Sequence, residues 1–203
     1  MAAITEMGQP LGLAVGNSLE VIEAIETLKG RGPADITELA LKLSGIMVYL
    51  GGKASSPEEG CRMTEEALRS GAGLEMLRKF IAAQGGNAAV VDDYSLFPQA
   101  SVQRELTAEA DGYVAQIAAR TIGLASQHTG AGRATKEDSI DLSAGVCLAK
   151  KVGDKVAAGE VLATFYGNDE TKVASAVEAA KEAFVISEEP VEAPELIKKI
   201  IGL

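Results

Sequence analysis

The sequence predicts an α/β protein of the α+β type, and three observations lead to that prediction. Up to about residue 90, apolar residues recur at three- and four-residue steps, which is typical of helices buried on one face. After Asp92-Asp93, short apolar segments are separated by Gly and Asp turns, which is typical of strands. The chain has 203 residues, 47% of them apolar and 24% charged, so it can form a core without metals or disulfides.

The first part of the chain is predicted to hold one strand followed by helices. Residues 2–7 are apolar at their start and have no preceding cap, which favours a strand whose partner is missing. Asn17 fits an N-cap, with Glu20 three residues on completing a capping box. Ser56 followed by Pro57 is a second helix start. The predicted helices cover residues 17–29, 35–50, a segment from 57, and 74–84.

The second part is predicted to be rich in strands. Turn residues at 109–111 separate two strands, and Gly153-Asp154 turns the chain between two others. The predicted strands cover 101–108, 112–119, 139–150, 160–166 and 184–187, and the predicted helices cover 120–128, 172–183 and 194–201.

Composition excludes several classes of partner. There are 19 Lys and Arg against 29 Asp and Glu, a net charge of −10, which argues against a nucleic-acid backbone or an anionic membrane as partner. No apolar run approaches the roughly 18 residues of a membrane span. The two cysteines, Cys61 and Cys147, form no metal or disulfide motif, which fits a reducing, cytoplasmic location.

Few catalytic motifs occur in the sequence. The sequence has one histidine, His128, and none of the common nucleophile, metalloprotease or phosphate-loop motifs. The glycines and arginine of 130–133 suit an anion, but their turn composition favours a structural loop. Neither cysteine adjoins a histidine or basic cluster, so both are interpreted as buried apolar residues.

The hairpin at 150–162, together with 111–114, resembles the two halves of the barrel-sandwich fold of biotinyl and lipoyl carrier domains. Such a carrier needs a modifiable lysine at the tip of the hairpin, in a sequence such as Met-Lys-Met. Lys150 and Lys151 precede the turn, and we interpret them as ordinary solvated charges. The carrier function is therefore not favoured.

The loop at 9–17 is a candidate cation site. A tight loop can direct backbone carbonyls inward, and a carboxylate in the following helix can complete a set of oxygen ligands. Such ligands suit Na⁺, K⁺, Mg²⁺ or Ca²⁺ rather than zinc. On spacing alone, Glu20, Glu23 and Glu26 are more often a solvated helix face.

Several strings together resemble the C-terminal half of the pyrimidine-nucleoside phosphorylases, a family close to thymidine phosphorylase. They cover nearly the whole chain in the right order. They are TEMGQPLG (5–12), AVGN (14–17), LKG (28–30), AQGG (83–86), GAGRATK (130–136) and KVGD (151–154).

The resemblance implies a fold and an activity. Residues 1–93 would be the C-terminal piece of the central phosphorylase α/β domain, with helices on a mixed sheet. Residues 94–203 would be the C-terminal β-rich subdomain, with its barrel-sandwich-like part. These homodimeric enzymes, which are pentosyltransferases, cleave uridine or thymidine with inorganic phosphate to the free base and (2-deoxy)ribose 1-phosphate. Their phosphate- and base-binding residues lie in the N-terminal half, so we expect no catalytic or substrate-binding residues here.

The resemblance also implies a potassium site. The bacterial enzymes bind K⁺ through two backbone carbonyls and a glutamate, and the matching positions are Leu11, Ala14 and Glu23. The remaining ligands come from a glycine-rich loop of the other half, so we do not expect this chain alone to retain K⁺. Glu6 and Gly8 stand where the family usually has Asp and Asn or Ser, which leaves these ligands unaffected.

Three interpretations of the chain follow. In the first, it is a truncated part of a phosphorylase that is cut at the start of a strand and is inactive alone. In the second, it is a stand-alone binding or carrier-like module. In the third, Met1 is a true start and a separate chain supplies the other half.

Overall fold

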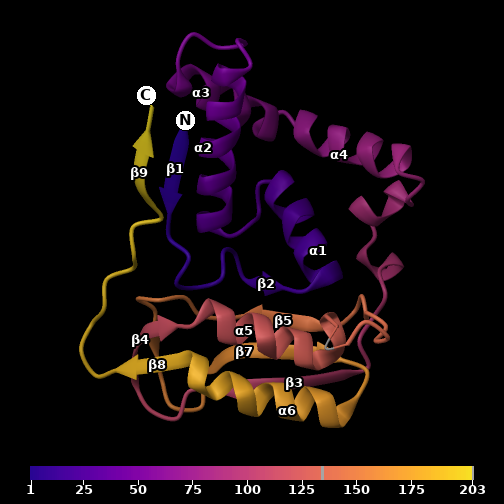
Figure 1. The fold of residues 1–203 in the computed structure, drawn as a ribbon, viewed down its shortest axis with the longest axis vertical. Helices are drawn as coiled ribbons and strands as arrows, with labels where there is room; N and C mark the ends of the chain where they lie inside the picture. Colours follow the sequence, from indigo (N-terminus) through magenta and orange to yellow (C-terminus); the bar gives the residue numbers. More distant parts are fainter. Residues whose placement is uncertain (134, 203) are drawn as a thin grey trace. The chain divides into compact units, whose positions relative to one another are not determined.

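The computed structural model describes residues 1–133 and 135–202, which divide into two compact units (Figure 1). The first unit consists of Met1–Thr5, Ile22–Leu96 and the segment from Leu196 onward. The second unit consists of Glu6–Val21 and Phe97–Glu195. The division falls within helix α1 (Asn17–Leu28).

The first unit is mainly helical, as the sequence predicts. The side-chain oxygen of Ser56 accepts a hydrogen bond from the backbone N–H of Glu59 at 3.2 Å, so the predicted cap starts the helix at Pro57. The helices of the first unit after α1 are α2 (Ala34–Leu50), α3 (Pro57–Arg69), α4 (Ala72–Ala83) and the 3-10 helices η1 (Ala88–Val91) and η2 (Tyr94–Leu96).

Two glycines allow α2 and α3 to approach closely. A Cβ at Gly60 would lie 2.1 Å from the carbonyl oxygen of Gly45, and a Cβ at Gly45 would lie 2.5 Å from the backbone nitrogen of Cys61. No side chain fits at either position, because the two backbones are already in contact.

The two ends of the described chain pair with each other in the first unit. Strand β1 (Ala2–Thr5) runs antiparallel to β9 (Ile197–Ile201), with Ala2 opposite Ile201, and the two lie side by side in Figure 1. The predicted helix over 194–201 is therefore wrong. Its apolar spacing fits a helix, but pairing with β1 satisfies the backbone groups of both segments, and β-branched isoleucines suit a strand.

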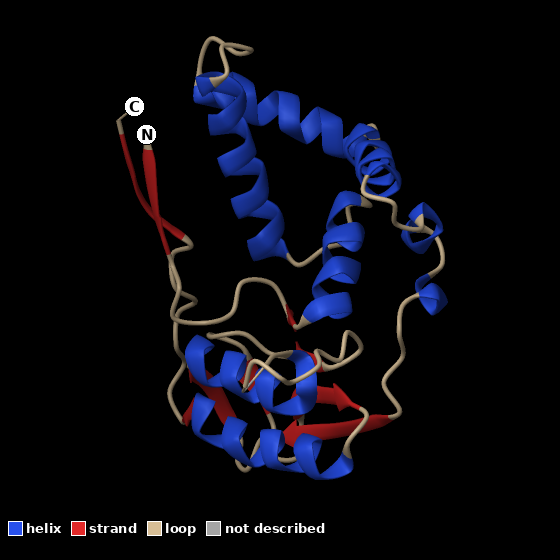
Figure 2. Cartoon of the chain, turned by 45° about the vertical axis from the view of Figure 1, so that its right-hand side comes forward, coloured by secondary structure: helices blue, strands red, loops and turns tan. Residues whose placement is uncertain are grey.

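The second unit contains two antiparallel sheets around one apolar core. The sheet orders are β2-β5-β7-β3 and β6-β4-β8. Phe165, Val146, Val114 and Ile117, which come from both sheets, are all fully buried. Helices α5 and α6 lie side by side against the strands (Figure 2).

The elements of the second unit follow the predicted order. The strand predicted over 139–150 is shorter, because 139–144 form a loop. The elements are β2 (Ala14–Val15), β3 (Val102–Thr107), β4 (Gly112–Ile117), α5 (Ala119–Ser126), η3 (Gln127–Ala131), β5 (Gly145–Leu148), β6 (Lys155–Val156), β7 (Val161–Gly167), α6 (Glu170–Ala180), η4 (Lys181–Ala183) and β8 (Phe184–Ser187).

The predicted α/β fold class is confirmed, and its details differ. Every strand pairing among the described residues is antiparallel, and the only sheet described in the first unit is β1-β9, so the mixed sheet under its helices is not present. In the second unit the two described sheets stay separate, without closing a barrel. The domain boundary at residue 93 stays a prediction. Within 1–133 and 135–202, no helix is long and apolar enough to cross a membrane.

Candidate cation-binding loop

The loop from Gly8 to Gly16 is attached to the rest of the second unit along its whole length. It brings together three regions that are distant in sequence: the start of α5, the end of α5, and the segment from β5 into the following turn. The hydrogen bonds are Ala119 N–H to Gly8 O (3.0 Å), Val152 N–H to Gln9 Oε1 (3.0 Å), Leu148 N–H to Leu13 O (2.7 Å) and Ser126 Oγ to Val15 O (2.7 Å).

Lys151 binds the same loop through its side chain. Its Nζ donates to the carbonyl oxygen of Gly12 at 2.9 Å and to that of Pro10. Gly12 has a φ of +68°, in the left-handed region that favours glycine. The interpretation of Lys151 as an ordinary solvated charge is therefore wrong: backbone carbonyls of the loop solvate its ammonium.

The strand register sets the direction of the Ala14 carbonyl. Ala14 lies opposite Cys147, and the neighbouring Leu13 accepts a hydrogen bond from Leu148. In an antiparallel pair, hydrogen-bonded and non-hydrogen-bonded positions alternate, so the backbone groups of Ala14 point away from β5. Because β2 is the edge strand of its sheet, the Ala14 carbonyl is directed to the outside of that edge.

Leu11 and Ala14 lie on this loop in the second unit, whereas Glu23 lies on α1 in the first unit. Two carbonyl oxygens and a carboxylate are hard donors, which fit an alkali or alkaline-earth cation. No group of three or more His, Cys, Asp or Glu residues able to hold a metal occurs in the described part of the chain. Carbonyl oxygens such as those of the loop are hard donors, and hard donors suit K⁺ better than a transition metal.

The start of helix α1 is held by side chains in a way that the sequence did not indicate. Oε1 of Glu20 accepts a hydrogen bond from the Gly16 N–H at 2.9 Å. Asn17 is already helical, and its Nδ2 donates to the carbonyls of Ala131 (2.8 Å) and Asp141 (3.3 Å). Asn17 therefore does not cap the helix; it fastens the loop to the glycine-containing segment at 130–133.

That segment has structural partners of its own. The carbonyl of Gly130 accepts from the Asp141 N–H at 2.9 Å, and the Gln127 side-chain amide donates to the Arg133 carbonyl. These contacts support the structural-loop interpretation over an anion site. Ala134, within the string GAGRATK, lies outside the described residues.

Glu26 is not the solvated residue that the helix spacing suggested. Arg31 donates two hydrogen bonds to its carboxylate, both of 2.8 Å, and the Tyr94 hydroxyl donates a third. Lys29 in turn donates to the Tyr94 oxygen at 2.9 Å. The hydrogen bonds from Arg31 and Tyr94 lower the pKa of Glu26 to about 2. Glu26 is thus part of an ion-pair network that joins α1 to η2.

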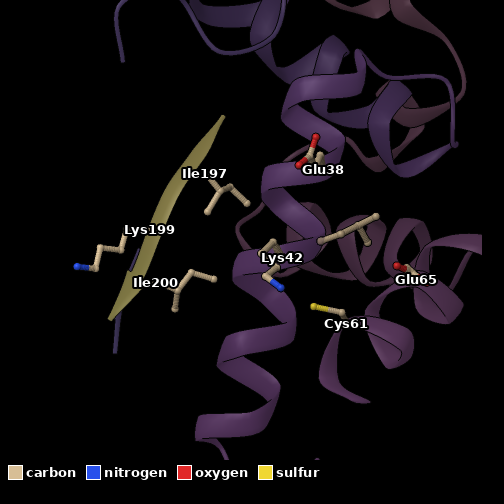
Figure 3. A pocket seen from close by; sticks show the side chains of 8 residues that line it. Glu38, Lys42, Cys61, Glu65, Ile197, Lys199 and Ile200 are labelled. Carbon is tan, nitrogen blue, oxygen red and sulfur yellow. The ribbon is translucent and has the colours of Figure 1, made fainter. Parts of the chain in front are cut away.

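A pocket of about 660 Å³ lies in the first unit between β9 and the helices α2 and α3 (Figure 3). Ile197 and Ile200 point from β9 toward α2, whereas Lys199 points away. Cys61 lines the opposite wall, and the single histidine of the sequence, His128, belongs to the second unit. The described residues of this pocket therefore offer Cys61 no imidazole as activating base.

Comparison with known proteins gives one family. Residues 113–187 match the model of the pyrimidine nucleoside phosphorylase C-terminal domain. A pyrimidine-nucleoside phosphorylase of Geobacillus stearothermophilus is 53% identical over 197 residues, which are 97% of this chain and 45% of that protein. Those of Bacillus subtilis and Staphylococcus aureus are 47% and 48% identical, over 99% of this chain and 46% of their own length.

The chain is a relative of the pyrimidine-nucleoside phosphorylases. The predicted resemblance to the C-terminal half of this family is confirmed, and the chain spans about half the length of the curated relatives it matches. The roles of Leu11, Ala14 and Glu23 stay predictions.

In this phosphorylase-related chain, the hairpin lysines are not presented as a carrier would present them. Lys150 forms an ion pair with Glu160 at 2.5 Å, and its side chain is only 19% exposed. Its hydrogen bond to Glu160, followed by that from the Ala157 N–H, lowers the pKa of the Glu160 carboxyl. Lys151 is bound to the loop. Both amines are therefore held against the second unit.

Proposed function

We propose that the chain forms part of a pyrimidine-nucleoside phosphorylase. In this reaction the bond between the base nitrogen and the sugar C1 breaks, and an oxygen of inorganic phosphate bonds to C1. The base leaves with the bonding electrons and takes up a proton. The observation that carries the proposal is the 53% identity over 97% of the chain. Phosphate and nucleoside would bind to residues outside this chain, which is expected to be inactive alone.

A potassium ion is part of this proposal. The carbonyls of Leu11 and Ala14 and the carboxylate of Glu23 would hold it, together with oxygens from the other half of the enzyme. The ion would supply positive charge and rigidity at this loop. The attachment of the loop along its length and the direction of the Ala14 carbonyl support this assignment. From the same resemblance we infer a cytoplasmic homodimer that acts in pyrimidine salvage.

A chimera tests the proposed function. The 203-residue chain replaces the matching 45% of the Geobacillus stearothermophilus relative, and the release of uracil from uridine is measured with and without phosphate. We expect phosphate-dependent release by the chimera and none by the 203-residue chain. A folded chimera without activity would refute the proposal, and uracil release by the chain alone would show that it is not merely a part.

The alternative is a carrier-like or binding module, based on the resemblance of the hairpin to carrier domains. The contacts of Lys150 and Lys151 disfavour its carrier version. Intact mass spectrometry of the protein from its native source tests the carrier function. An added biotinyl or lipoyl group would support that function, and an unmodified mass excludes it.

A further inference from the structure

We propose that Lys151 is a positioning residue for the cation-binding loop. Its ammonium binds the carbonyls of Pro10 and Gly12, one on each side of Leu11, and so sets the orientation of the Leu11 peptide groups. This inference rests on the potassium part of the proposed function and extends it to a residue 139 positions away from Gly12 in the sequence.

The pattern of hydrogen bonds along the loop carries the inference. Within residues 10–15, the carbonyls of Pro10 and Gly12 accept from Lys151, that of Leu13 from Leu148, and that of Val15 from Ser126. These four carbonyls are directed into the second unit. They flank the two positions, 11 and 14, that the family resemblance assigns to K⁺.

Lys151 differs from the backbone and hydroxyl partners because its one ammonium binds two carbonyls of the loop. A single ammonium that draws Pro10 and Gly12 toward one point bends the chain between them, and the left-handed φ of Gly12 permits that bend. The backbone of Lys151 is itself anchored, because its N–H donates to Asp154 Oδ2 at 2.7 Å. The neighbouring Val152 N–H binds the side chain of Gln9. The turn at 151–154 therefore holds the loop in one conformation.

The first experiment measures the loop without any metal. In Lys151→Met, the aliphatic side chain is retained and the ammonium is lost. Amide hydrogen exchange of the peptide spanning residues 9–15 is compared with that of the unsubstituted chain. We expect exchange in this peptide to be at least about tenfold faster, the ratio that corresponds to the loss of one charge-assisted hydrogen bond. Lys155→Met, in the same hairpin at an exposed position, is the matched control and should leave the loop unchanged.

The second experiment measures K⁺ in the chimera. Its thermal stability is titrated with KCl against tetramethylammonium chloride at constant ionic strength, so that only coordination of K⁺ differs. We expect Lys151→Met to raise the KCl concentration at half-effect about tenfold, with kcat at saturating KCl unchanged. Lys151→Arg, which keeps a cationic donor, should restore the lower value, a rescue that a merely structural role would not give.

The outcomes separate this proposal from the proposed function. Unchanged exchange in Lys151→Met would overturn the positioning role, as would faster exchange with an unchanged KCl half-effect. An unsubstituted chimera that catalyses phosphorolysis but gains no stability from K⁺ would overturn the cation site and this inference together. A chimera that K⁺ stabilises through Lys151 but that lacks activity would uphold the inference and refute the phosphorolysis proposal.

Discussion

Gly60→Ala is expected to destabilise the first unit by forcing α2 and α3 apart. The new Cβ would lie 2.1 Å from the carbonyl oxygen of Gly45, a distance that real Cβ contacts essentially never show. The Cβ is fixed in place by the α3 backbone and the carbonyl oxygen belongs to the α2 backbone, so neither atom can rotate away. Overpacking of this kind costs about 1–3 kcal/mol, and here the separation must increase by about 1 Å, which favours the upper part of that range. The better helix propensity of Ala offsets up to about 1 kcal/mol.

The net expectation for Gly60→Ala is a loss of about 2 kcal/mol, or a melting temperature lower by about 4–8 °C. The assay is thermal and urea unfolding followed by far-UV circular dichroism. Gly73→Ala is the control in the same unit, because the nearest atom to its Cβ, at 3.1 Å, is the mobile end of the Leu28 side chain. It should change stability by less than about 1 kcal/mol. If Gly60→Ala were as stable as Gly73→Ala, the close approach of α2 and α3 would not be a packing constraint.

Three further predictions concern the ion-pair network, the core and the end strands. Glu26→Gln should cost about 1–2 kcal/mol at pH 7, a range reduced for solvent screening because Arg31 is 62% exposed. The folded pKa of Glu26 is lowered to about 2 from 4.5, so its contribution to the free energy of unfolding is complete above pH 4.5 and is lost as the pH falls toward 2. Urea unfolding at several pH values should therefore show the stabilities of the unsubstituted chain and of Glu26→Gln converging at low pH. Phe165→Ala should lower the free energy of unfolding in urea by about 3–5 kcal/mol, because Phe165 is fully buried between the two sheets. A loss of stability below about 1 kcal/mol would contradict the described core. Ile200→Pro should break the β1-β9 ladder, and sedimentation should then show concentration-dependent association through the exposed edge of β1, whereas a strictly monomeric variant would argue against that pairing.

The fold could be predicted from the sequence where the relevant signal is local. Ser56 and Pro57 are adjacent residues whose chemistry determines a helix start, and the structure starts α3 there. The turn residues at 109–111 likewise separate two strands within one short segment, and the structure has β3 and β4 on either side of them. The segment at 197–201 shows the limit of this reasoning. The spacing of its isoleucines fits both a helix and a strand. The segment forms a strand because it pairs with β1, at the other end of the described chain.

The candidate site was predictable in its residue types and not in its construction. A loop with carbonyls followed by a helix with glutamates can be recognised within fifteen residues, and the family resemblance named Leu11, Ala14 and Glu23 among them. The groups that shape the loop come from far away: Lys151 lies 139 residues beyond Gly12, and Asn17 reaches a carbonyl 114 residues on. No local pattern distinguishes Lys151 from Lys150 beside it, although one binds loop carbonyls and the other pairs with Glu160.

This difference explains why a lysine next to a turn is weak evidence for a function. The same side chain can be a carrier attachment point, a solvated charge or a structural cation, and its sequence neighbours are compatible with all three. The structure distinguishes the two lysines by the oxygens that their ammonium groups bind. Lys150 pairs with a carboxylate, whereas Lys151 binds two backbone carbonyls of the loop.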